Sequence, residues 1–257
     1  MSPARYMAAG GEESDGVGEA GCGRQEGSEV MPSHLRRRPR VLLGLTGSVA
    51  SIKAAPLVAA LALIADVKVV ATAAATHFFD AADLPLVDPG ANVFADEDEW
   101  HTWRVVGDPV VHIELRRWAD ILLVAPLSAN TLAKLANGMC DNLLTCVVRA
   151  WDFGDEEKRV LLAPAMNTCM WESPFTRRHL DAMLHLGGSG GSGGEKRGTG
   201  GDGGGDSARI SGGTVGVIDP VEKVLACGDV GNGAMASVDT IVATVALHAG
   251  NLALAAD

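Results

Sequence analysis

A short polar motif directly follows an apolar run in the second half of the chain. Residues 160–163 read Val-Leu-Leu-Ala, which predicts a buried strand, and residues 164–171 read Pro-Ala-Met-Asn-Thr-Cys-Met-Trp. Open α/β sheets place their chemistry where parallel strands end. An amide offers donors and an acceptor in fixed geometry, so Asn167 is a candidate for holding a substrate carboxylate. The alternative is that Asn167 caps the helix that follows while its apolar neighbours pack the turn.

A glycine-rich segment near the C-terminus surrounds a single thiol. Residues 226–236 read Ala-Cys-Gly-Asp-Val-Gly-Asn-Gly-Ala-Met-Ala. Glycine permits backbone conformations that other residues avoid, so this segment could close over a site as a mobile lid. Cys227 is then a candidate catalytic thiol. The alternative is a small buried hydrophobic residue, which is the commoner role of a lone cysteine.

One histidine stands before a short polar helix. His112 opens the segment His-Ile-Glu-Leu-Arg-Arg-Trp-Ala-Asp, residues 112–120. It is a candidate general base because imidazole exchanges protons near neutral pH. Taken alone, a single histidine is more often structural.

Composition excludes several classes of function. The 257 residues carry a formal net charge of -11, with a pI near 5.0, whereas a nucleic-acid-binding face needs a net basic surface. The longest apolar run, residues 57–65, is shorter than the roughly 20 residues of a membrane span. The five cysteines are scattered without a C-x-x-C pair, so neither a disulfide framework nor a metal site is indicated. We expect a cytoplasmic protein, with no secretion signal, no nucleic-acid partner and no membrane association.

Strand and helix patterns alternate from residue 40 onward. This rhythm predicts an α/β fold with a doubly wound parallel sheet in a single domain, residues 39–257. Residues 1–38 are rich in Gly, Glu, Ser and Arg and are predicted to be a disordered tail. Residues 188–213 form a Gly-rich insertion that is also expected to be disordered. The expected strands are 41–45, 67–71, 121–125, 159–163 and 214–218, and the expected helices are 50–65, 128–137, 141–151, 174–186 and 238–252.

Three predicted strand ends lead into small or hydroxyl-bearing turns. They are residues 46–48, 126–131 and 164–167, each before the N-terminus of a predicted helix. Hydroxyls and helix N-termini bind phosphate without adding charge, although each hydroxyl could equally be an ordinary N-cap. The chain lacks the G-x-G-x-x-G fingerprint of dinucleotide sites and the P-loop. A mononucleotide such as FMN is therefore favoured over a dinucleotide.

Six motifs occur in an order that resembles the family of homo-oligomeric flavin-containing cysteine decarboxylases. The resemblance runs from about Arg40 to Leu252, apart from the Gly-rich insertion. It implies a flavodoxin-like fold, bound FMN and a homotrimer with active sites at the subunit interfaces. The motifs are residues 47–49, 112–120, 125–131, 140–145, 164–171 and 226–236.

The resemblance also implies an activity, which is FMN-dependent decarboxylation of the small molecule 4'-phosphopantothenoylcysteine to 4'-phosphopantetheine in coenzyme A biosynthesis. The expected intermediates are a thioaldehyde and an enethiol. By the family's pattern His112 is the base of the oxidative half, and Cys227 completes the reduction. Asn167 and Arg117 hold the substrate carboxylate, with Met170 beside them. The residues expected to line FMN are Gly47, Ser48, Val49, Thr72, Phe78, Ser128, Ala129, Asn130, Thr131 and Ala165.

The chain departs from the family pattern in three places. Residues 73–75 are all alanine where relatives carry polar residues, and Ser237 stands where an acidic residue is expected. The third departure is the Gly-rich insertion itself. Two other functions stay open: a regulator of a protein phosphatase, and a flavin prenyltransferase or peptide-cysteine decarboxylase on the same fold. The combination of His112, Asn167 and Cys227 favours the enzyme, because a binding protein has no chemical need for all three.

Overall fold

The computed structural model describes residues 37–85, 93–101, 103–188, 208–210, 213–224 and 230–255. The predicted disordered tail lies outside these ranges except for its last two residues, and so does most of the predicted Gly-rich insertion. Cys227 also lies outside the described residues.

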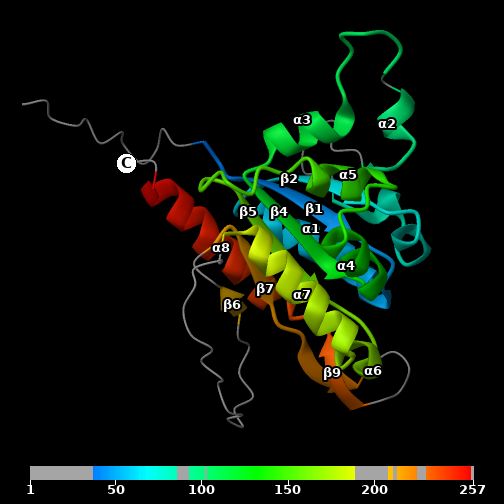
Figure 1. Ribbon diagram of the computed structural model, residues 1–257, viewed down its shortest axis with the longest axis vertical. Helices are drawn as coiled ribbons and strands as arrows, with labels where there is room; N and C mark the ends of the chain where they lie inside the picture. Colours follow the sequence, from blue (N-terminus) through cyan, green and yellow to red (C-terminus); the bar gives the residue numbers. More distant parts are fainter. Residues whose placement is uncertain are drawn as a thin grey trace, which may run out of the picture. The chain divides into compact units, whose positions relative to one another are not determined.

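Seven strands of the described chain form one sheet in the order β3-β2-β1-β4-β5-β7-β6 (Figure 1). All neighbours pair in parallel except β6, which pairs antiparallel with β7 at the edge. The central order β2-β1-β4-β5-β7 is that of a flavodoxin-like sheet, which confirms the predicted fold class. The strands are β1 (Arg40–Leu45), β2 (Asp66–Ala71), β3 (Val93–Phe94), β4 (Ile121–Leu127), β5 (Arg159–Pro164), β6 (Ala208–Ile210) and β7 (Val215–Ile218).

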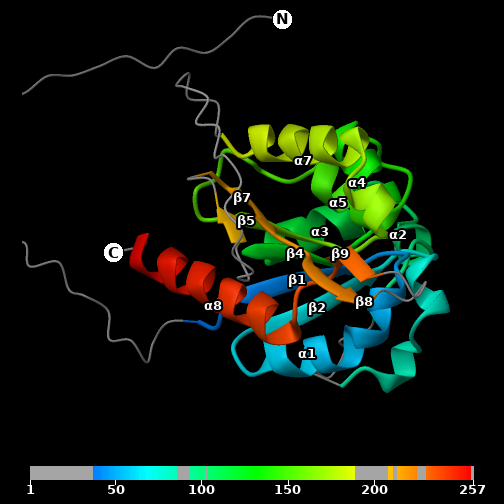
Figure 2. The same ribbon diagram turned by 90° about the horizontal axis from the view of Figure 1, so that it is seen from below.

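Helices cover both faces of the sheet, as Figure 2 shows with α1 and α8 on one face and α3, α4, α5 and α7 on the other. The helices are α1 (Ala54–Ala62), α2 (Asp98–His101), α3 (Val111–Trp118), α4 (Ala129–Ala136), α5 (Leu143–Arg149), α6 (Thr168–Trp171), α7 (Pro174–Leu186) and α8 (Val238–Ala255). Three short 3-10 turns are η2 (Val49–Lys53), η3 (Ala75–His77) and η4 (Ala81–Asp83).

The strand β4 is apolar throughout, and β1 and β5 are apolar after their first residue, because both faces of these strands are buried. In β1, Val41 and Leu43 belong to the core on the α1 and α8 side, whereas Leu42 belongs to the core on the α5 and α7 side. In β4, Leu123 and Leu122 divide between the two cores in the same way. The alternation lets each central strand contribute to the cores on both faces of the sheet.

Asp120 holds the amino-terminal edge of the sheet together. Its carboxylate accepts hydrogen bonds from the Arg40 N–H at 2.8 Å and from two nitrogens of the Arg37 guanidinium, each at 2.7 Å. Burial alone raises the pKa of Asp120, but Arg37 and the Arg40 N–H outweigh it and hold that pKa below its usual range. The residues predicted for the site follow the carboxyl-terminal ends of the strands, at the opposite edge.

The helix α8 carries a buried histidine. His248 is 5% exposed, and among the described residues its Nε2 has no hydrogen-bond partner. Burial lowers the pKa of His248, and the nearby Arg159 lowers it further. In the described chain neither α8 nor any other helix combines the length and the apolar character that crossing a membrane requires.

The buried histidine predicts an acid-sensitive fold. In the unfolded chain histidine protonates near its ordinary pKa of about 6.5, whereas the lowered pKa resists protonation in the folded protein. The unfolded state therefore binds more protons as pH falls through that value, and stability is lost. Urea unfolding from about pH 7.5 to about pH 5.5 should show a shallower loss in His248→Leu than in the native protein. The matched control is His77→Leu, at an exposed position, which should keep the native slope; equal slopes in all three proteins would contradict the prediction.

Candidate active site

The turns that follow β1, β2, β4 and β5 meet at the carboxyl-terminal edge of the sheet. Each contains residues that the sequence predicts for a binding site, namely Gly47 and Ser48 after β1, Thr72 after β2, Ser128 after β4, and Ala165 with Asn167 after β5. Parallel pairing places these four turns side by side.

Thr46 ties two of the turns together. Its hydroxyl donates to the carbonyl oxygen of Pro126 at 2.7 Å and accepts from the Ser128 N–H at 2.8 Å. Its own carbonyl accepts from the Ser48 N–H at 2.7 Å and from the Ser51 hydroxyl at 2.9 Å. Thr46 is fully buried. The sequence indicates a turn here, but no pattern in it singles out Thr46 as the residue that joins β1 to β4.

Gly47 lies where the β1 and β2 turns touch. A Cβ at this position would come within 2.6 Å of the Ala74 Cβ, so no side chain fits without a shift. Thr72 is buried beside it and donates from its N–H to the Leu45 carbonyl at 3.0 Å. Phe78 is half-buried at the end of η3. Gly47 therefore lets the β1 and β2 turns pack closely against each other.

Ser128 caps α4, as its N-cap alternative anticipates. Its hydroxyl accepts from the Thr131 N–H at 3.2 Å and donates to the Thr131 hydroxyl, also at 3.2 Å. Both residues are buried, whereas Asn130 is exposed and Ala129 is half-buried. Ser48 caps η2 more loosely, accepting from the Ala50 N–H at 3.4 Å. Val49 is exposed at this edge.

Asn167 also adopts the capping role. Its Oδ1 accepts from the Cys169 N–H at 2.8 Å, at the start of α6. This bond fixes the rotation of the amide, and hence the direction of its NH₂ group. Ala165 is buried, and its N–H donates to the Leu127 carbonyl at 2.9 Å, which holds this turn against the end of β4. Met170 is exposed on α6.

A hairpin of β8 (Val221–Val224) and β9 (Val230–Ala234) packs onto this turn. The Gly233 carbonyl accepts from the Met166 N–H at 2.9 Å, and Gly233 has φ of 135°. A Cβ on Gly233 would meet the Met166 carbonyl oxygen at 2.3 Å, and one on Gly231 would meet Thr168 Oγ1 at 2.6 Å. These two glycines let β9 dock directly on α6. The segment containing Cys227 connects the two strands of this hairpin and lies outside the described residues.

His112 and Arg117 lie on α3, away from the Asn167 turn. In Figure 1, α4 and α5 lie between α3 and α6. His112 Nδ1 is 2.5 Å from Glu99 Oε1 on α2. Arg117 is 64% exposed and donates to Glu114 at 2.9 Å on the same helix. Within one chain, therefore, the predicted base His112 and the predicted carboxylate ligand Arg117 both lie apart from Asn167.

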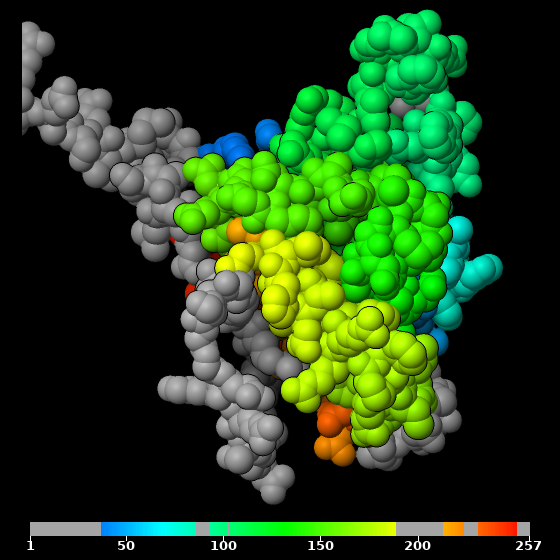
Figure 3. Space-filling view, viewed as in Figure 1, coloured from blue at the N-terminus to red at the C-terminus, as the bar shows by residue number. Residues whose placement is uncertain are grey.

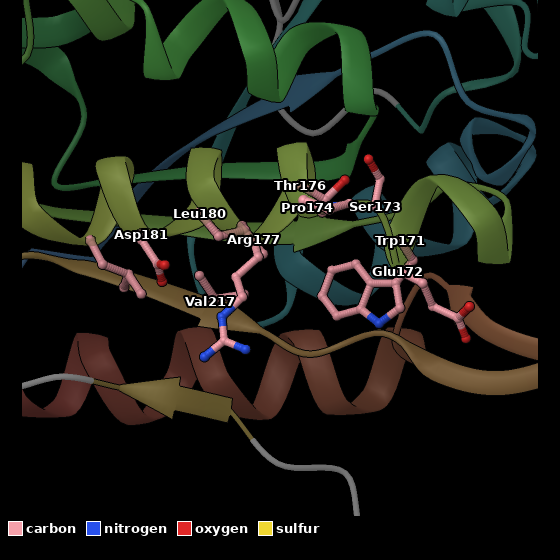
Figure 4. Close-up of a pocket in the computed structure, with 10 residues that line it drawn as sticks. Trp171, Glu172, Ser173, Pro174, Thr176, Arg177, Leu180, Asp181 and Val217 are labelled. Carbon is pink, nitrogen blue, oxygen red and sulfur yellow. The ribbon is translucent and has the colours of Figure 1, made fainter. Parts of the chain in front are cut away.

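A cavity of about 480 Å³ opens elsewhere, beside α7 (Figure 4). Trp171, Arg177, Leu180 and Val217 are among the residues that line it, and none of the predicted site residues does. The strand-end site is instead a surface of turns.

An apolar surface surrounds the connection between α2 and α3. Trp100, Trp103, Val105 and Val106 are all exposed, Trp100 by 77% and Val106 by 94%. Figure 3 shows this segment projecting from the body of the described chain. Such a group of large apolar side chains is typical of an interaction surface.

The strand-end turns suit an anionic ligand held without a metal or a cation. The predicted donors are neutral hydroxyls and main-chain N–H groups. Across the described residues, no cluster of three His, Cys, Asp or Glu side chains could hold a metal ion.

Comparison with known proteins agrees with this architecture. Residues 29–191 match the family model described as Flavoprotein. Phosphopantothenoylcysteine decarboxylase HAL3 of Malus domestica is 49% identical, over 85% of this chain and 87% of that protein. A solved mutant of PPC decarboxylase, complexed with pantothenoylaminoethenethiol, is 46% identical and covers 82% of this chain and 98% of its own, with a TM-score of 0.68. The FMN binding protein AtHal3 is 47% identical and covers 82% of this chain and 96% of its own, with a TM-score of 0.66.

The fold thus defines a flavodoxin-like α/β protein, whose strand-end turns carry neutral hydroxyl groups. The chain belongs to the Flavoprotein family, among relatives that include phosphopantothenoylcysteine decarboxylases.

The bridging hydroxyl of Thr46 makes a stability prediction. Thr46→Val keeps the shape of the side chain but leaves the Ser128 N–H and the Pro126 carbonyl without this partner. We expect the free energy of unfolding, measured in urea, to fall by about 1–3 kcal/mol. The control is Thr76→Val, which removes one hydroxyl bond at an exposed site and should change stability by less than about 0.5 kcal/mol. A Thr46 variant as stable as this control would refute the bridging role.

Proposed function

We propose that this chain catalyses the FMN-dependent decarboxylation of 4'-phosphopantothenoylcysteine to 4'-phosphopantetheine in coenzyme A biosynthesis. The observation that carries the proposal is the docking of the β8–β9 hairpin, which contains the Cys227 segment, onto the Asn167 turn at the strand ends. The agreement with decarboxylases over most of the chain supports it.

The strand-end turns are the proposed FMN site. Ser48, Ser128 and Thr131 would bind the phosphate through hydroxyls and helix N-termini. Gly47 would keep the β1 and β2 turns of this site in close contact, since its Cβ position is already filled by Ala74. Val49, Thr72, Phe78, Ala129, Asn130 and Ala165 would complete the walls. When bound, FMN would supply an acceptor for one hydride, which carries two electrons, and would later return it.

The protein's own groups supply the proton transfers and the positioning. A cysteine carboxylate has no electron sink beside it, so oxidation at the thiol-bearing carbon must precede the loss of carbon dioxide. In this proposal His112 removes the proton for that oxidation. Asn167 and Arg117 hold the carboxylate beside Met170. Cys227 gives a proton to the enethiol during its reduction, because a thiol is a neutral donor at cellular pH.

We further propose a homotrimer with interfacial active sites. The separation of α3 from α6 within one chain supports this, because a second chain could bring its His112 and Arg117 to the Asn167 turn. The exposed apolar surface at Trp100, Trp103 and Val106 adjoins α3, where such a contact would form.

The cytoplasm is the compartment that the proposal assumes. In the described residues Cys140, Cys146 and Cys169 are free thiols, which suits a reducing environment.

The direct test is to purify the protein, record its visible spectrum and assay substrate turnover by product mass in the same sample. We expect yellow protein that forms 4'-phosphopantetheine. Colourless protein would argue against the flavin site, and yellow protein without product would argue against the decarboxylase.

The proposed thiol can be tested separately. Cys227→Ser should still release carbon dioxide from the substrate but accumulate the oxidised enethiol, because the late proton donor is missing. Mass spectrometry of the product distinguishes the two outcomes. Cys140→Ser, at an exposed thiol outside the site, should form 4'-phosphopantetheine normally. Normal product from Cys227→Ser would refute its role.

The interface can be tested by charge. Trp100→Glu combined with Trp103→Glu should shift the mass in light scattering from three chains to one, because burying two carboxylates in an apolar contact is unfavourable. Turnover should fall with the trimer. Leu63→Glu places the same charge at another exposed apolar position and should leave the mass unchanged. A trimer that persists with both tryptophans replaced would place the interface elsewhere.

A further inference from the structure

His112 has a buried acidic partner that no sequence motif indicates. Glu99 lies on the four-residue helix α2, and its Oε1 is 2.5 Å from His112 Nδ1 on α3. The Glu99 side chain is 10% exposed and that of His112 is 24% exposed. A carboxylate is rarely buried to this extent without a specific partner.

The surroundings of Glu99 direct its charge to His112. In the described chain His112 is its only ion-pair partner, and its second oxygen, Oε2, is buried without a hydrogen bond. On the α5 side stands Cys146, where burial and then Glu99 raise the pKa of the thiol to about 11. Cys146 is therefore a neutral neighbour at cellular pH and does not compete for the carboxylate as a cation would.

The helix α2 is held in place independently of His112. Asp98 accepts from the Ala95 N–H at 2.8 Å, where α2 begins. Asp96 accepts from the Leu143 N–H at 2.9 Å, which attaches the segment to the N-terminus of α5. The segment that carries Glu99 is thus anchored by two contacts just before it in the sequence, neither of which involves His112.

The contact determines which nitrogen of His112 is open for chemistry. An ionised carboxylate can only accept, so Nδ1 must carry the proton and Nε2 carries the lone pair in the neutral ring. A ring held in this tautomer can take a proton at Nε2 without first rotating or exchanging the proton on Nδ1.

We infer that Glu99 is a positioning residue for His112, which holds the imidazole as the Nδ1–H tautomer and presents Nε2 as the basic atom. The inference rests on the proposed function, in which His112 is the base. The substrate proton moves to Nε2, the Nδ1 proton stays on the ring, and Glu99 remains ionised beside the resulting imidazolium.

The test combines turnover with a direct view of the ring in the FMN-bound protein. Glu99→Gln should lower kcat by up to about 10²- to 10⁴-fold, the range of general base catalysis, with little change in KM. Glu99→Asp keeps the charge but withdraws it by one methylene. Its kcat should therefore lie between that of the native protein and that of Glu99→Gln. The matched control is Glu97→Gln, at an exposed acid two residues away, which should keep native kcat.

Nitrogen NMR of ¹⁵N-histidine-labelled protein reports the tautomer without any need for turnover. The His112 signals are assigned by their absence from His112→Gln. We expect the Nδ1–H form in the native protein and its loss or mixture with the other tautomer in Glu99→Gln. His112 in the Nε2–H form, or native kcat in Glu99→Gln, would overturn the role of Glu99.

Different results would contradict the proposed function and the positioning role of Glu99. A native protein that binds FMN but does not turn over the substrate overturns the proposed function. The native tautomer overturns or upholds the role of Glu99 whatever the turnover is.

Discussion

The architecture of the site depends on one buried hydroxyl, that of Thr46. It donates to the Pro126 carbonyl and accepts from the Ser128 N–H two residues later. These bonds join β1 and β4 beyond their last ladder pair. The other links of these turns run to their outer neighbours, from Gly47 to Ala74 and from Leu127 to Ala165. Because the partners of Thr46 are main-chain atoms, the link keeps the geometry of the edge independent of the side chains that face a ligand. The strand-end turns are therefore attached to the sheet by main-chain contacts.

Much of this fold follows from sequence periodicity. Both faces of the central strands are buried, so their continuous apolar runs predict strands, and their alternation with helical segments predicts the parallel sheet. Sequence periodicity does not predict the shorter elements. The strand β3 has two residues, and β9 reads Val-Gly-Asn-Gly-Ala, a composition that argues against a strand until its docking on α6 is seen. Tertiary contact, rather than propensity, makes the β8–β9 hairpin.

For the same reason, the sequence predicts some residues of the candidate site and not others. Hydroxyls and glycines after buried strands can be recognised from type and position, as Ser128 and Gly47 illustrate. Thr46 and Glu99 act through contacts between distant segments, and nothing in their local sequence marks them. The capping alternative for Asn167 is present in the structure, and it orients the amide that the proposed function uses, so the two interpretations of that residue are compatible.

The antiparallel strand β6 has a consequence for the behaviour of the protein in concentrated solution. Without β6, the outer side of β7 would present a row of N–H and C=O groups that could recruit the sheet of another molecule. Three residues pair with Gly216, Val217 and Ile218 and cover that row. A strand this short is a poor template for further pairing. β6, which lies within the predicted Gly-rich insertion, therefore protects the protein from aggregation through the edge of its sheet.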